Sequence, residues 1–117
     1  MVPMIIAVNV SGSLVGSGLG RAKTIAIATV EDSQILSWEE FDVGWDVSHD
    51  QMTVGRNGQP SHGSHHGAIV SFMKQHHVEA VITGHAGPPM AHTLDLMGIR
   101  LIQNVVGDAK QAVLNLG

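Results

Sequence analysis

The chain has 117 residues, of which 44% are hydrophobic and 3% are aromatic, and its mean hydropathy is +0.17. These values fit one compact domain over residues 1–117 and exclude a disordered chain. The sequence contains no cysteine. Disulfides, thiolate metal sites and cysteine nucleophiles are therefore excluded, and any metal must be held by histidine, carboxylate or backbone groups.

Charge and hydropathy also limit the partners. The net charge is −4 with neutral histidines, and there are eight histidines, so their protonation would reverse its sign. The surface potential is therefore expected to depend on pH where imidazole titrates. The sequence lacks the stripe of lysine and arginine residues that is typical of nucleic-acid-binding proteins, so a nucleic-acid partner is not expected. No apolar run is long enough to span a bilayer, and the first residues do not resemble a signal peptide, so we expect a cytoplasmic protein.

The first part of the chain predicts three strands. Met4–Val10 has the apolar density of a central strand. Thr24–Val30 alternates β-branched residues with alanine, and Gln34–Val43 suits an edge strand that forms a hairpin with it. The glycine- and serine-rich segment Ser11–Gly20 is predicted to be a loop. Because a strand rather than a helix is expected after it, a dinucleotide- or phosphate-binding loop is disfavoured.

The second part alternates helices with strands. The predicted elements are a helix from about His65 to His77 with Ala68, Ile69, Phe72 and Met73 inward, a strand over Val78–Thr83, a helix over Pro88–Met97, a strand over Ile99–Gln103 and a helix over Asp108–Leu116. The order β-β-β-α-β-α-β-α predicts an α/β fold with a five-stranded mixed sheet and helices on both faces. The connection over residues 44–64 is long, which is typical of a functional or mobile loop.

A glycine-rich turn, Gly84–Pro88, joins the buried strand to the next helix. Open α/β sheets bind ligands where such turns follow the carboxyl ends of strands, and a helix N-terminus favours negative ones. Pro88 suits the first helical position. We predict that Gly84 and Gly87 leave backbone amides open and that His85 contacts a ligand. The alternative for His85 is an exposed turn residue.

Three histidines, His62, His65 and His66, lie within five residues of the chain. Together with His85 they could ligate zinc, copper or iron, or contact the edge of a metal cluster. The alternative is a solvated loop that precedes the helix. Arg21, which follows the first glycine-rich loop, would balance an anionic ligand or is an ordinary surface arginine.

Other residues argue against specific chemistries. Asn9 stands on the first strand, where nucleic-acid hydrolysis by two metal ions would need an aspartate, so a nuclease is disfavoured. No serine or threonine lies in a nucleophile elbow. His76 and His77 fall in the last turn of a predicted helix, where imidazolium interacts favourably with the helix dipole.

The order of these landmarks resembles the dinitrogenase iron–molybdenum cofactor accessory family, which includes cofactor carriers of nitrogenase assembly and the molybdenum–copper orange protein type. The matching segments are the apolar first strand, Gly20-Arg21-Ala22, Ser61–Gly67, Thr83–Pro88 and Gly107–Ala112. The resemblance implies a ribonuclease H-like fold. It also implies a site that holds an iron–molybdenum or molybdenum–copper type cluster through histidine. Two departures are the long connection over residues 44–61 and Ala86, where many relatives carry cysteine.

The leading hypothesis is therefore a non-catalytic carrier of a metal cluster or similar anionic metallo-ligand. It would use His62, His65, His66 and His85 as metal ligands, with Gly84, Gly87 and Arg21 contacting the cofactor. Its partners would be the cluster and a donor or acceptor protein, and a homodimer is compatible with the sequence. One alternative is a histidine-coordinated zinc or iron hydrolase with Asp46 or Asp50 as the base. Another is a ligand-free interaction module whose histidines respond to pH.

Overall fold

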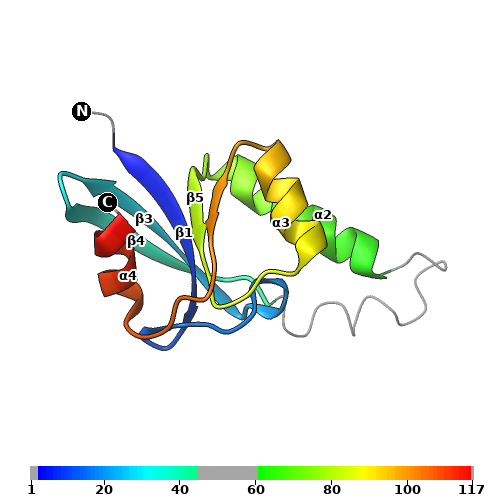
Figure 1. Ribbon diagram of the computed structural model, residues 1–117, viewed down its shortest axis with the longest axis horizontal. Helices are drawn as coiled ribbons and strands as arrows, with labels where there is room; N and C mark the ends of the chain where they lie inside the picture. The colour runs from blue at the N-terminus through cyan, green and yellow to red at the C-terminus, as the bar shows by residue number, and fades with distance from the viewer. Residues whose placement is uncertain (1–2, 45–60, 117) are drawn as a thin grey trace.

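The computed structural model describes residues 3–44 and 61–116, with the side chains of residues 61–66 outside the description. Figure 1 shows the strands, helices and termini. The elements are β1 (Met4–Ser11), β2 (Leu14–Val15), the 3-10 helix η1 (Leu19–Arg21), β3 (Thr24–Glu31), β4 (Gln34–Asp42), α2 (Ser61–Gln75), β5 (Ala80–Ile82), α3 (Pro88–Leu96), β6 (Arg100–Ile102) and α4 (Ala109–Leu116). The predicted mixed α/β order is confirmed. β2 and η1 lie inside the segment predicted to be a loop.

The sheet has the strand order β4-β3-β1-β5-β6, with β2 paired to β1. β3 is antiparallel to β1 and to β4, whereas β5 is parallel to β1 and to β6. β1 is therefore central and β4 is an edge strand in a hairpin with β3, as their sequences predict. The predicted count of five strands is wrong, because Leu14 and Val15 turn back on Ser11 and Val10 to form a sixth. Two residues are too few for a periodic pattern to reveal a strand.

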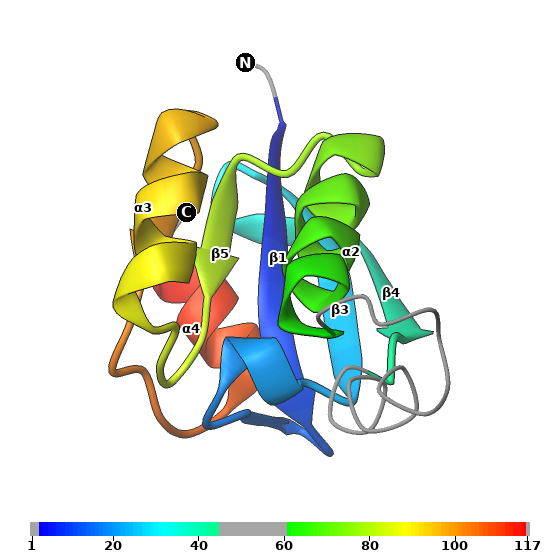
Figure 2. The same cartoon turned by 90° about the vertical axis from the view of Figure 1, so that its right-hand side faces the viewer.

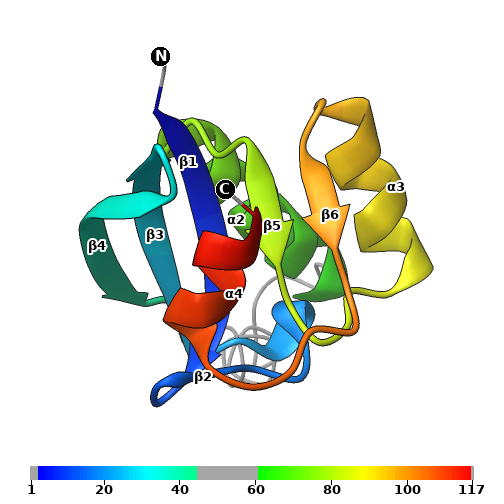
Figure 3. The same ribbon diagram turned by 60° about the vertical axis from the view of Figure 1, so that its left-hand side comes forward.

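Helices cover both faces of the sheet. α2 and α3 lie on one face and α4 on the other (Figures 2 and 3). The side chains of β1 alternate accordingly: Ala7 belongs to the core under α2 and α3, and Ile6 and Val8 belong to the core under α4. Among the described residues of the three α-helices, Ile69 and Met73 of α2, Leu94 of α3 and Val113 of α4 are 0% exposed. A central strand covered on both faces must be apolar at nearly every position.

The bounds of α2 differ from the prediction. The helix begins at Ser61, about one turn before the predicted start, and ends at Gln75. Ala68 is exposed rather than inward, whereas Ile69 and Met73 are fully buried. Ala68 is next to Ile69 in sequence, so the helical rotation carries its side chain beyond the edge of the stripe that faces the sheet.

The residues after α2 end the helix by packing and by backbone geometry. The ring of His76 is half-buried between Phe41 and Phe72, with centroids 4.7 Å and 4.5 Å away. His77 has a positive φ of 57°, and the N–H of Val78 donates to the carbonyl of Met73 at 3.1 Å. A left-handed residue followed by such a bond is the usual way to satisfy the last helical carbonyls. None of the described helices is long and apolar enough to cross a membrane.

The core under α3 can be tested with two leucines of the same helix. Leu94 is fully buried and Leu96 is 74% exposed. Leu94→Ala is expected to lower the free energy of unfolding by about 2–5 kcal/mol, because it removes buried methyl groups and leaves a cavity. Leu96→Ala should change it by less than about 0.5 kcal/mol. Urea denaturation followed by circular dichroism measures both; equal losses would contradict the described packing of α3.

Candidate functional site

Two segments cross at the carboxyl ends of β1 and β5. One follows β1 and contains η1; the other is the turn after β5. The N–H of Gly84 donates to the carbonyl of Gly16 at 2.9 Å, and the N–H of Leu19 donates to the carbonyl of His85 at 2.8 Å. The start of η1 is thus bonded directly to the turn that carries His85.

Glycine is required where these segments meet. A Cβ on Gly84 would lie 3.0 Å from the carbonyl oxygen of Gly16 and from Cα and the carbonyl oxygen of Ser17. A Cβ on Gly16 would lie 2.5 Å from Oδ1 of Asn9. A side chain at Gly84 would press on the backbone of the other segment, and a side chain at Gly16 would displace the buried amide of Asn9 on β1.

A buried polar pair fixes the strands below the crossing. Asn9 on β1 is 2% exposed and Thr83, directly after β5, is fully buried. Nδ2 of Asn9 donates to Oγ1 of Thr83 at 3.1 Å, and that hydroxyl donates to the carbonyl of His85 at 3.4 Å. Removing either side chain would leave a buried polar group without its partner, which is costly. The pair therefore stabilises the position of the His85 turn relative to β1.

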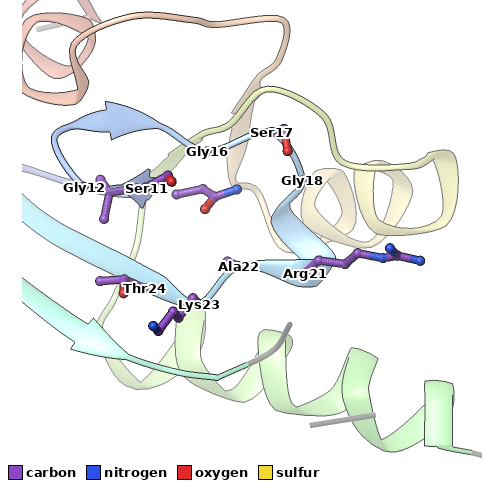
Figure 4. A pocket seen from close by; sticks show the side chains of 11 residues that line it. Ser11, Gly12, Gly16, Ser17, Gly18, Arg21, Ala22, Lys23 and Thr24 are labelled. Atoms are coloured by element: carbon purple, nitrogen blue, oxygen red, sulfur yellow. The ribbon is translucent and has the colours of Figure 1, made fainter. Parts of the chain in front are cut away.

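A cavity of about 450 Å³ opens between the end of β1, the start of β3 and η1. Its lining residues are Asn9, Val10, Ser11, Gly12, Gly16, Ser17, Gly18, Arg21, Ala22, Lys23 and Thr24. Figure 4 shows this group of side chains. It contains two cations, three hydroxyl groups and one amide, and no carboxylate is among these lining residues. Such a lining attracts anions.

Two of the predicted site residues, Arg21 and His85, lie near each other but do not line the same pocket. Arg21 is exposed and lines the cavity, and in Figure 4 its side chain extends away from Ser11 and Gly12, while Lys23 lies apart from it. His85 is exposed on the adjacent turn and is not one of the residues that line the cavity. The cavity and His85 are therefore on different sides of the crossing.

The backbone amides of the turn are less open than predicted. The amide of Gly84 is bonded to Gly16, and the N–H of Ala86 donates to Oε1 of Gln103 at 3.0 Å. α3 begins with Pro88 and Pro89, neither of which has an N–H to offer. The prediction of an open amide at Gly84 is wrong. The sequence predicts that the N-terminus of α3 binds an anion through its backbone N–H groups, and Pro89 removes one more of these groups.

His62, His65 and His66 lie in the first turns of α2 rather than in a loop. α2 contacts η1, and the N-terminal end of α2, η1 and the turn before α3 lie at the same end of the molecule (Figure 2). The side chains of these histidines are outside the described residues, so their role as ligands stays a prediction. Among the described residues, no three His, Asp or Glu side chains form a metal site. Asp46 and Asp50, the bases of the hydrolase hypothesis, also lie outside the described residues.

Sequence reasoning missed most of the cavity lining, including Ser11, Ser17, Lys23 and Thr24. The sequence disfavours a phosphate-binding loop in this glycine-rich segment, because a strand rather than a helix is expected after it. The structure instead has a single 3-10 turn there, which leads directly into β3. The sequence feature that could have indicated this cavity is the glycine- and serine-rich segment followed by two closely spaced cations, Arg21 and Lys23.

These features define a small α/β protein with a cation-lined cavity at the carboxyl end of its central strand. The chain belongs to the dinitrogenase iron-molybdenum cofactor family, because the model of that family matches residues 2–116. The resemblance noted from the sequence is thereby confirmed. No curated protein matches the chain.

Solved structures share the fold. PH0822 superposes with a TM-score of 0.70 and 18% identity, over 96% of this chain and 89% of that one. The apo form of the orange protein from Desulfovibrio gigas has a TM-score of 0.65 and 21% identity, over 99% and 89% of the two chains. MJ0327 from Methanocaldococcus jannaschii has a TM-score of 0.64 and 14% identity, over 99% and 88%. At these identities the structures establish the common fold.

The crossing can be tested with two glycines. Gly84→Ala is expected to destabilise the protein by about 1–3 kcal/mol, because the new methyl group would press on the backbone of residues 16 and 17. Gly18→Ala is the matched control, since its Cβ would meet nothing within 4 Å and its φ of −138° suits any residue. Thermal and urea unfolding of both variants measures the difference. If Gly84→Ala is as stable as Gly18→Ala, the two segments do not approach as described.

Proposed function

We propose that the chain binds and carries a pre-assembled anionic metallo-ligand, such as a cluster of the iron–molybdenum or molybdenum–copper type, without catalysing a reaction. Family membership supports a cofactor-related role. The observation that carries the proposal is the position of η1, which is bonded to the His85 turn and contacts α2. This arrangement gathers Arg21, His85 and the histidine-bearing turns of α2 at one end of the molecule.

The proposed roles follow from the chemistry of the side chains. The imidazole of His85 is exposed and would contact the metal or sulfide edge of the cargo, together with His62, His65 and His66. The guanidinium of Arg21 would offset the negative charge of the cargo. Gly84 would contribute by allowing the His85 turn to approach Gly16 and Ser17 closely. Gly87 would contribute as the residue that immediately precedes the first turn of α3. Because His85 and Arg21 are exposed, a donor or acceptor protein could reach the same ligand.

The ribonuclease H-like classification is proposed together with this role. A two-metal nuclease would need a carboxylate on the central strand. Here that strand has Asn9, whose side-chain amide is already bonded to Thr83. The neutral residue leaves the end of β1 without negative charge, which suits an anionic cargo better than a pair of metal cations.

The proposal predicts that His85 matters and that His92, an exposed histidine on α3, does not. Untagged protein would be incubated with tetrathiomolybdate and cuprous ion, desalted, and measured for bound molybdenum, copper and visible absorbance. His85→Ala is expected to weaken retention by about tenfold, the effect of losing one strong polar contact.

His92→Ala should retain as much metal as the unmodified chain. Two results would contradict the proposal: equal retention by the two histidine variants, or no retention by the unmodified chain. Unfolding curves for both variants would show that the fold is intact, since both side chains are exposed.

A further inference from the structure

We propose that the cavity lined by Arg21 and Lys23 is a separate binding site for a tetrahedral oxyanion, a phosphate or sulfate group that is either free or the head of a small ester. This inference goes beyond the proposed carrier function and does not require it. It starts from the residues between β1 and β3, of which Arg21 is also part of the proposed carrier site. The other carrier residues, His85 and those of α2, do not line this cavity.

The charge of the lining selects an anion. Arg21 and Lys23 are both exposed cations, with the side chain of Arg21 extending away from Ser11 and Gly12 and Lys23 lying apart from it (Figure 4). No aspartate or glutamate is among the described lining residues. Asp42 pairs with Thr24 across the sheet but is not one of the residues that line the cavity. An anion entering the cavity would therefore meet positive charge and no acidic side chain among the described lining residues.

The donors in the lining suit oxygen rather than a metal. Ser11, Ser17 and Thr24 bring hydroxyl groups and Asn9 brings an amide, and all four can donate hydrogen bonds. The described lining residues include no histidine, cysteine, methionine or carboxylate. They therefore offer none of the side chains that transition metals commonly prefer. A tetrahedral oxyanion accepts several hydrogen bonds at once and forms strong, charge-assisted ones with lysine and arginine.

The walls of the cavity are held before any ligand arrives. The carbonyl of Lys23 accepts hydrogen bonds from the N–H groups of Val43 at 2.9 Å and Gly44 at 3.1 Å, which fixes the backbone that carries the lysine. On the opposite wall, the N–H of Gly16 donates to the carbonyl of Asn9 at 2.7 Å. Because this backbone is already ordered, binding would mainly order the two long cationic side chains.

The size of the cavity leaves room for more than an inorganic ion. A volume of about 450 Å³ falls in the range of pockets that bind small organic molecules. The shared chemistry is the tetrahedral oxyanion, and its source is either the free ion or a small phosphate ester. Comparing inorganic phosphate with glycerol 3-phosphate would distinguish the two.

The test is a titration of the full-length, isotope-labelled chain with sodium phosphate at constant ionic strength, followed by amide NMR. The amide signals of Ser11, Gly12, Ser17, Lys23 and Thr24 are expected to shift. Lys23→Gln should weaken phosphate binding by about tenfold, the effect of one charge-assisted hydrogen bond. Lys110→Gln is the matched control, because Lys110 is an exposed lysine on α4 that does not line this cavity.

Tighter binding of glycerol 3-phosphate than of phosphate would identify an ester as the ligand, and equal or weaker binding would identify the free ion. Three results would overturn the proposal: no saturable shifts, shifts confined to other surfaces, or equal affinity of the Lys23→Gln and Lys110→Gln variants. His85→Ala should bind phosphate normally, so a failure of the carrier proposal would be distinguishable from a failure of this one.

Discussion

The site depends on one close backbone contact, the crossing of the segment after β1 with the turn after β5. Hydrogen bonds from Gly84 to Gly16 and from Leu19 to His85 join the two segments. The absence of a side chain at Gly84 allows that approach, and the absence of one at Gly16 leaves room for the amide of Asn9. Because η1 begins at Leu19, the crossing also sets where η1 lies. The cavity then opens on one side of it and the imidazole of His85 is presented on the other.

We propose that this end of the sheet binds negative ligands, since no acidic residue is among the described residues that line its cavity. The usual source, free amides at a helix N-terminus, is reduced here by Pro88 and Pro89. Arg21 and Lys23 supply the positive charge instead, from the short connection between β1 and β3. Asn9 contributes by remaining neutral while its side chain joins the central strands through Thr83.

The architecture could be predicted from the sequence because hydrophobic patterns determine it. β1 is apolar at nearly every position and is central, and Gly98 with a φ of 77° ends α3 as predicted. β2 and η1 were missed because elements of two and three residues have no periodicity. The cavity could not be foreseen because Asn9 and Lys23 come together only through strand pairing. His85 was recognised from its local turn, yet the bonded amide of Gly84 depends on a distant segment.

We propose that His85 and Arg21, which the crossing holds at the same end of the molecule, both contact an anionic metallo-ligand. The most direct test of this proposal is amide NMR of the full chain during titration with tetrathiomolybdate and cuprous ion. The account predicts that the largest changes fall at Leu19, Arg21, His85 and the first turns of α2. Changes confined to the opposite side, at Trp38 and along α4, would contradict it.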